Sequence, residues 1–291
     1  MLGTNACSGE RAFERLANSP FNSFRHAMET SLVVKLVSAV LTVLALSAIA
    51  ERAHPRISGV IAGMPLGSVF VYFFTGHERG ADYIVASVPY GLASFSGTLL
   101  FVVVFIVVGR RWPSLGAYGS LGLALVAFFM FALVLVLIPF NLWTGAALTI
   151  LAAIASDRLF RHVDFVRVAI PVHMHFKLMI LRSALAAVFV TAAIAVASAL
   201  NSRWAGIMVG FPMTMLPTIV ILLRSYDTSV THAFLRNFPF GMGSIIVFLV
   251  TVPFTFPPLG VSLGVAVSLA LSLVYTAAAM WVSGRRAMRP G

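Results

Sequence analysis

The sequence predicts an all-α polytopic membrane protein of about nine transmembrane helices in two structural repeats. Three observations lead to this fold class. Of the 291 residues, 60% are apolar and only 10% are charged, whereas about 25% of the residues in soluble domains are charged. Several apolar runs reach about 18 residues or more, the length that a bilayer requires. A glycine-proline segment also occurs twice, at 59–67 and at 206–214.

Polar or proline-containing segments separate the predicted spans, which cover residues 32–50, 57–75, 84–108, 117–138, 141–156, 178–200, 204–223, 238–256 and 260–283. The apolar stretch 117–156 would reach roughly 60 Å as one helix, about twice the hydrocarbon thickness. We therefore expect it to fold back at the Pro-Phe-Asn sequence within 138–143. A second stop is expected where the span 238–256 runs into Pro257 and Pro258.

The chain divides into a disordered leader, a first membrane repeat with an extra helix, a cytoplasmic loop, and a second repeat with a basic tail, at 1–27, 28–156, 157–177 and 178–291. The leader is polar and has no apolar core of a signal peptide. It is either a disordered tail or a misassigned start, because Met28 begins a second plausible start. The single cysteine, Cys7, excludes an intrachain disulfide.

The formal net charge of +11 does not indicate a nucleic-acid partner, because the basic residues lie in short loops between apolar runs. Nine spans place most Lys and Arg on one side and leave only Arg79 and Arg203 on the other, if the leader is set aside. The positive-inside rule then puts the C-terminus in the cytoplasm. The asymmetry would be weaker if 141–156 did not cross.

An internal duplication relates the two halves. Arg56, Gly59, Gly63 and Pro65 match Arg203, Gly206, Gly210 and Pro212; Lys35 matches Arg182; and Pro89 and Gly91 match Pro239 and Gly241. Five predicted spans precede the second copy, so it enters the membrane from the opposite side. Inverted repeats of this kind are frequent among secondary transporters, whose sites lie near the midplane on interrupted helices. If 141–156 is re-entrant, the repeats are parallel.

The repeated segments have two interpretations. Small residues four apart permit close helix packing, and a membrane proline often only kinks its helix. Alternatively, the backbone groups freed at mid-depth form a substrate site. Lys35 and Arg182 would either snorkel to the interface or attract an anionic substrate. The candidate substrate-binding residues are Gly63, Pro65, Ser68, Gly210, Pro212, Thr214, Lys35 and Arg182.

The polar residues limit the possible chemistry. No acidic residue lies within a predicted span, which disfavours a metal-ion or cationic-drug pump. His173 and His175 are two apart and do not share a helix face, so we predict no metal and no cofactor. Motifs such as HExxH, the P-loop, GxSxG and CxxC do not occur, so we do not expect an enzyme.

The run SGVIAGMPLGSVFVYFFTGHERGADYIVASVPYGLASF, at 58–95, resembles the core of the GlpM-type small bacterial inner-membrane proteins. The positions that carry the resemblance are Gly63, Pro65, Gly76, Glu78, Arg79 and Gly80, and the segment TGHERGAD is expected as an interfacial loop. The second half keeps the glycine-proline part but not Glu-Arg-Gly. The resemblance implies a bacterial inner (cytoplasmic) membrane location, while the family supplies no activity.

These observations predict a secondary transporter or permease for an anionic or neutral small molecule or a lipid-linked solute. The alternative is a non-transporting membrane subunit that supports envelope polysaccharide or lipid biosynthesis or export. Expected partners are membrane lipids, an unknown small-molecule substrate, and a second copy of the chain in a homodimer or a protein of an envelope complex.

Overall fold

The computed structural model describes residues 37, 65–161, 176–225, 228–236 and 238–287. Within these ranges it is all-helical and contains no strand, which confirms the predicted all-α class. Five segments are long and apolar enough to cross a membrane: Ala81–Arg111, Pro113–Leu137, Leu142–Arg161, Ser202–Ser225 and Gly241–Ala279. The predicted span 32–50, apart from residue 37, and residues 57–64 of the next span lie outside the described residues.

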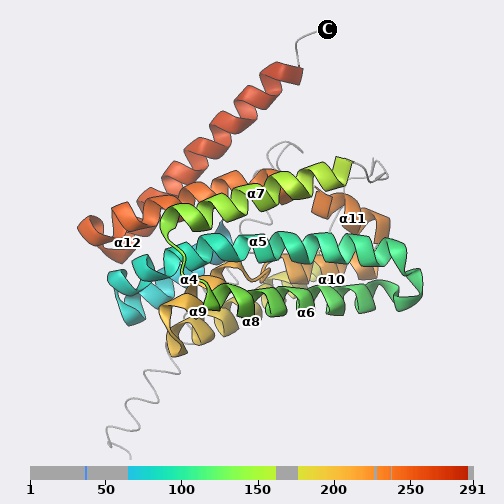
Figure 1. The fold of residues 1–291 in the computed structure, drawn as a ribbon, viewed down its shortest axis with the longest axis horizontal. Helices are drawn as coiled ribbons and strands as arrows, with labels where there is room; N and C mark the ends of the chain where they lie inside the picture. Colours follow the sequence, from blue (N-terminus) through green and yellow to red (C-terminus); the bar gives the residue numbers. More distant parts are fainter. Residues whose placement is uncertain (1–36, 38–64, 162–175, 226–227, 237, 288–291) are drawn as a thin grey trace, which may run out of the picture.

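The described helices are α4 (Leu66–Arg79), α5 (Ala81–Arg111), α6 (Gly116–Leu137), α7 (Leu142–Arg161), α8 (Phe176–Ala199), α9 (Ser202–Gly210), α10 (Met215–Ser225), α11 (Thr228–Arg236) and α12 (Phe238–Ala287). Figure 1 shows α5 through the middle of the bundle, with α6 and α7 on either side. The same helix also packs against α9 and α12.

The inner and outer helices differ in burial. In the apolar part of α5, 78% of the residues are buried, compared with 33% in the segment of α6 and 22% in α7. The outer faces carry large apolar side chains, including Leu137 at 79% exposure and Leu151 at 64%. Apolar outer faces of this kind are what a lipid environment accommodates. Thus α5 forms the core around which the other helices are arranged.

The predicted fold-back is confirmed, because α6 ends at Leu137 and α7 begins at Leu142. The carboxamide oxygen of Asn141 accepts hydrogen bonds from the Trp143 and Thr144 backbone N–H groups, at 3.0 and 2.9 Å. In return, the Thr144 hydroxyl accepts from the Asn141 N–H at 2.9 Å. Asn141 is therefore the N-cap of α7, which satisfies backbone donors that the start of a helix leaves open.

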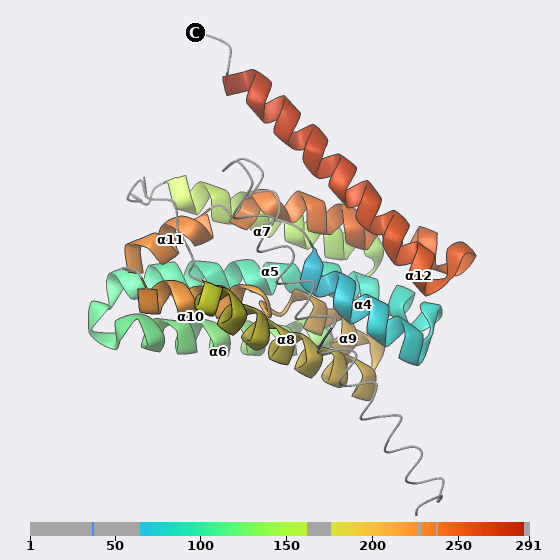
Figure 2. The same cartoon turned by 180° about the vertical axis from the view of Figure 1, so that it is seen from behind.

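The prediction that Pro257 and Pro258 end a helix is wrong in its detail. The helix α12 continues through both prolines and changes direction at Gly260, where φ is 72°. A proline removes one N–H group but does not force a reversal, whereas glycine adopts positive φ without steric cost. Figure 2 shows the second arm of α12 projecting away from the bundle.

Buried hydroxyl pairs join the two arms of α12 at two levels along their length. The Ser244 and Ser272 hydroxyl oxygens lie 2.7 Å apart, and those of Thr255 and Ser268 lie 2.8 Å apart. Because buried hydroxyl groups need partners in an apolar environment, these pairs fix the two arms against each other.

The segment TGHERGAD is not a loop as predicted. The helix α4 continues to Arg79, and the chain turns at Gly80, where φ is 90°. The side chains near this end are bonded to the helices around them. His77 Nδ1 donates to the Phe73 carbonyl at 2.8 Å, and Ser198 of α8 donates to Glu78.

Candidate functional site

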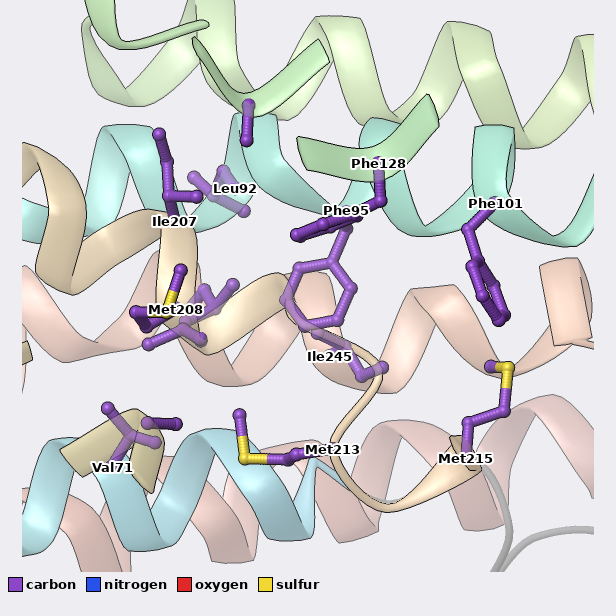
Figure 3. Close-up of a cluster of buried hydrophobic side chains, with 14 of the residues drawn as sticks. Val71, Leu92, Phe95, Phe101, Phe128, Ile207, Met208, Met213, Met215 and Ile245 are labelled. Carbon is purple, nitrogen blue, oxygen red and sulfur yellow. The ribbon is translucent and has the colours of Figure 1, made fainter. Parts of the chain in front are cut away.

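The second glycine-proline segment breaks its helix. The helix α9 ends at Gly210, and α10 begins at Met215. Since Pro212 has no N–H group for the Met208 carbonyl, that oxygen instead accepts from the Phe211 N–H at 3.2 Å. Figure 3 shows the chain between Met208 and Met215 leaving the helical path, with Met213 beside α4. The interruption predicted for this span is therefore present.

The first glycine-proline segment meets the second at this break. Pro65 directly precedes α4 with a non-helical backbone (φ −76°, ψ 40°), and its carbonyl accepts from the Val69 N–H at 2.8 Å. The Met213 side chain lies so close to Gly67 that a Cβ added to the glycine would be 3.2 Å from Met213 Cγ. The two copies of the repeated segment are thus in contact.

A cavity of about 90 Å³ lies where the two segments meet. Its lining includes the hydroxyl-bearing residues Ser68, Thr98, Thr214 and Thr218 together with the apolar side chains Phe95, Phe211, Met213, Met215, Phe234, Phe238 and Ile245. This volume holds several water molecules or one small solute, whereas pockets for drug-sized ligands measure about 300–1,000 Å³.

The structure brings together five of the predicted site residues around this cavity: Pro65, Ser68, Gly210, Pro212 and Thr214. Gly63 and Lys35 lie outside the described residues. Arg182 is on α8, and its side chain is also outside the description. No described residue of the lining is acidic or basic. Within the described ranges, no group of three His, Cys, Asp or Glu side chains could hold a metal ion.

The helices α4 and α10 both begin at the cavity and extend to opposite ends of the bundle. Gly67 in the first turn of α4 and Met215 at the start of α10 contribute to the lining. From there α4 runs toward the corner of α12, while α10 runs toward α11 (Figures 1 and 2). Each helix start carries the partial positive charge of its dipole. At α10, however, the Met215 and Leu216 N–H groups already donate to the Pro212 carbonyl, and Pro217 has no N–H group.

The glycines of α9 serve close packing, which is the first of the two interpretations of the motif. A Cβ added to Gly206 would overlap the Ser87 carbonyl oxygen and lie 2.7 Å from the Gly91 nitrogen. A Cβ added to Gly210 would lie 2.7 Å from Ser94 Cβ. Both glycines face α5, so α9 and α5 are in backbone contact at this point.

Two hydroxyl groups of α5 stabilise the broken end of α9, and the sequence analysis did not identify either of them. Thr98 donates to the Gly210 carbonyl. The Ser94 hydroxyl donates to the Gly91 carbonyl of its own helix at 2.7 Å and makes a longer contact of 3.4 Å with the Gly206 carbonyl. The two contacts with α9 bring hydroxyl groups to carbonyls near the C-terminus of that helix. The signal was the spacing of Ser87, Gly91, Ser94 and Thr98, small residues three or four apart on one face of α5.

Comparison with protein-family models, with curated proteins and with solved structures gives no match. The resemblance of 58–95 to the GlpM-type proteins therefore remains a prediction.

Proposed function

We propose that the protein is a secondary transporter or permease for a small neutral or anionic solute, which binds in the cavity between α4 and the α9–α10 break. The observation that carries this proposal is that both glycine-proline segments line one hydroxyl-bearing cavity. Non-helical backbone within a membrane is tolerated only beside protein or around a polar cavity. Discontinuous helices at the contact of two repeats are the usual setting of transporter sites.

We further propose that the two halves are inverted repeats. The opposite directions of α4 and α10 in Figures 1 and 2 support this relation. The length of α7 also supports it, because a fifth crossing would reverse the second copy. With the positive-inside rule, the C-terminus then lies in the cytoplasm. The resemblance to GlpM-type proteins favours a bacterial inner membrane.

The cavity volume of about 90 Å³ favours a small solute over the lipid-linked solute that the sequence left open. A lipid-linked head group with its chain would need far more room than several water molecules occupy.

A non-transporting membrane subunit is the second candidate. It is favoured by the projecting second arm of α12, where Leu263 and Val274 are exposed at 62% and 67%. A partner-binding subunit would be expected to turn its small residues outward. Gly206 and Gly210 instead face α5, so we prefer the transporter.

Solute entry into liposomes tests the transporter proposal. The full-length chain is reconstituted, and light scattering follows the osmotic response to formate, acetate and glycerol. We expect at least one solute to enter faster than in protein-free liposomes. Thr214→Phe should remove this increase, because the ring would fill the cavity.

Leu263→Phe on the exposed arm of α12 is the matched control and should keep the activity of the unmodified chain. Equal entry rates for the unmodified chain, Thr214→Phe and protein-free liposomes would contradict the proposal.

A further inference from the structure

The cavity contains a buried hydroxyl group that no described residue satisfies. Ser68 is only 2% exposed and lines the cavity. Its side chain forms no hydrogen bond with any residue in the described ranges, although other buried serines such as Ser87 and Ser94 bond to carbonyls of their own helix. A buried hydroxyl without a partner costs free energy. Ser68 is therefore placed to bond to a molecule inside the cavity.

The backbone around Ser68 supplies positive rather than negative potential. Both α4 and α10 begin at the cavity, and a helix N-terminus carries about +0.5 of an elementary charge. At α10 the Met215 and Leu216 N–H groups already donate to the Pro212 carbonyl and Pro217 has none, so α4 contributes most of this potential. The C-terminus of α9 also ends there and carries the opposite sign. However, Thr98 donates to its Gly210 carbonyl, which occupies this acceptor and reduces its attraction for a cation.

No described residue of the lining carries a charge, so among the described residues the helix N-termini are what can balance a charged ligand. Two helix N-termini together supply at most about one positive charge, and the bonded N–H groups of Met215 and Leu216 reduce the share of α10. The two N-termini can balance one negative charge, whereas a second charge would remain uncompensated in an apolar environment. A volume of about 90 Å³ accommodates a halide or a carboxylate of few atoms.

We propose that this cavity binds one small monovalent anion, of the size of chloride or formate, between the Ser68 and Thr214 hydroxyls and the N-termini of α4 and α10. The proposal rests on the proposed function, since it names the solute class for the same site. It narrows the solute class from a neutral or anionic molecule to an anion with a single negative charge. Ser68 and Thr214 act as donors, and the first turns of the two helices supply the balancing potential.

Binding of radioactive chloride to the purified full-length chain tests this proposal. A scintillation proximity measurement should give saturable binding with about one ion per chain. Non-radioactive formate should compete, whereas gluconate, which is too large, and glycerol, which is uncharged, should not. Ser68→Ala and Thr214→Val should each weaken binding about tenfold, the effect of losing a hydrogen bond to a charged group.

Two control variants separate the role of the hydroxyls from folding. Thr214→Ser keeps the donor and should restore binding, and Ser244→Ala alters a buried hydroxyl outside the cavity and should leave binding unchanged. If Ser68→Ala does not fold, competition by formate but not by gluconate in the unmodified chain decides the question. The anion proposal is overturned if chloride binding is not saturable, or if a folded Ser68→Ala variant binds as well as the unmodified chain.

The binding and flux experiments can fail independently. Chloride binding without solute entry into liposomes would support the anion site and overturn the transporter. Entry of glycerol without chloride binding would support a transporter and overturn the anion site.

Discussion

The glycines that the structure describes in the two glycine-proline segments are packed differently, and they are not counterparts in the repeat. Gly67 matches Thr214, whereas Gly59 and Gly63, which match Gly206 and Gly210, lie outside the described residues. In the second copy, Gly206 and Gly210 lie against the backbone and short side chains of α5, where no added atom fits. In the first copy, the described atoms nearest to a Cβ added at Gly67 belong to the flexible side chain of Met213. The two positions therefore differ in how much added volume they tolerate. The second copy anchors the broken helix to the core, while the first brings a helix start and the Ser68 hydroxyl to the cavity.

The largest expected effect is at the second copy. Gly206→Ala should destabilise the protein by about 3 kcal/mol, at the upper end of the cost of overpacking, because the Ser87 carbonyl and the Gly91 nitrogen are backbone atoms that cannot move aside. Thermal unfolding of the purified protein measures this.

Gly122→Ala on α6 is the matched control, since nothing lies within 4 Å of that position. It should be neutral or stabilise by up to about 1 kcal/mol. Equal unfolding temperatures for the two variants would show that α9 and α5 are not in backbone contact.

A smaller effect is expected at Thr98, whose hydroxyl bonds to the end of α9 at the break between α9 and α10. Thr98→Val should destabilise by about 1–3 kcal/mol, because it leaves the buried Gly210 carbonyl without its donor. Thr251→Val is the control, since the Thr251 hydroxyl bonds only to carbonyls of its own helix. Denaturant unfolding compares the two. Similar losses would mean that the hydroxyl of Thr98 has no special role at the break.

The smallest effect is expected at the first copy. Gly67→Ala should change stability by less than about 1 kcal/mol, because Met213 can adjust its side chain and alanine favours the helix. The same thermal measurement applies. A loss as large as that of Gly206→Ala would remove the distinction between these two positions.

Much of the fold could be predicted from local sequence. Apolar run lengths gave the helical class, and the Pro-Phe-Asn sequence gave the reversal between α6 and α7, because a proline and a capping asparagine act on their immediate neighbours. The position of the corner in α12 was harder to predict from the sequence. Pro257 and Pro258 were the stronger breakers by type, but the turn depends on the backbone conformation of Gly260.

The candidate site was predictable in part for a similar reason. The repeat identified Pro65 and Pro212, which the structure places at one cavity. Ser94 and Thr98 were not identified, because their role depends on which face of α5 meets α9. That contact joins residues more than a hundred positions apart. A search for small residues at helical spacing opposite Gly206 and Gly210 would have found them.

The most direct test of the central claim, that the two repeated segments enclose a cavity open to small polar molecules, is thiol accessibility. Ser68→Cys and Thr214→Cys are made in a Cys7→Ser background, with Ser244→Cys as a buried control outside the cavity. The account predicts that a small water-soluble methanethiosulfonate reagent modifies the cysteines at 68 and 214 in intact membranes and leaves the one at 244 unmodified. Protection of all three cysteines, or equal modification of all three, would contradict it.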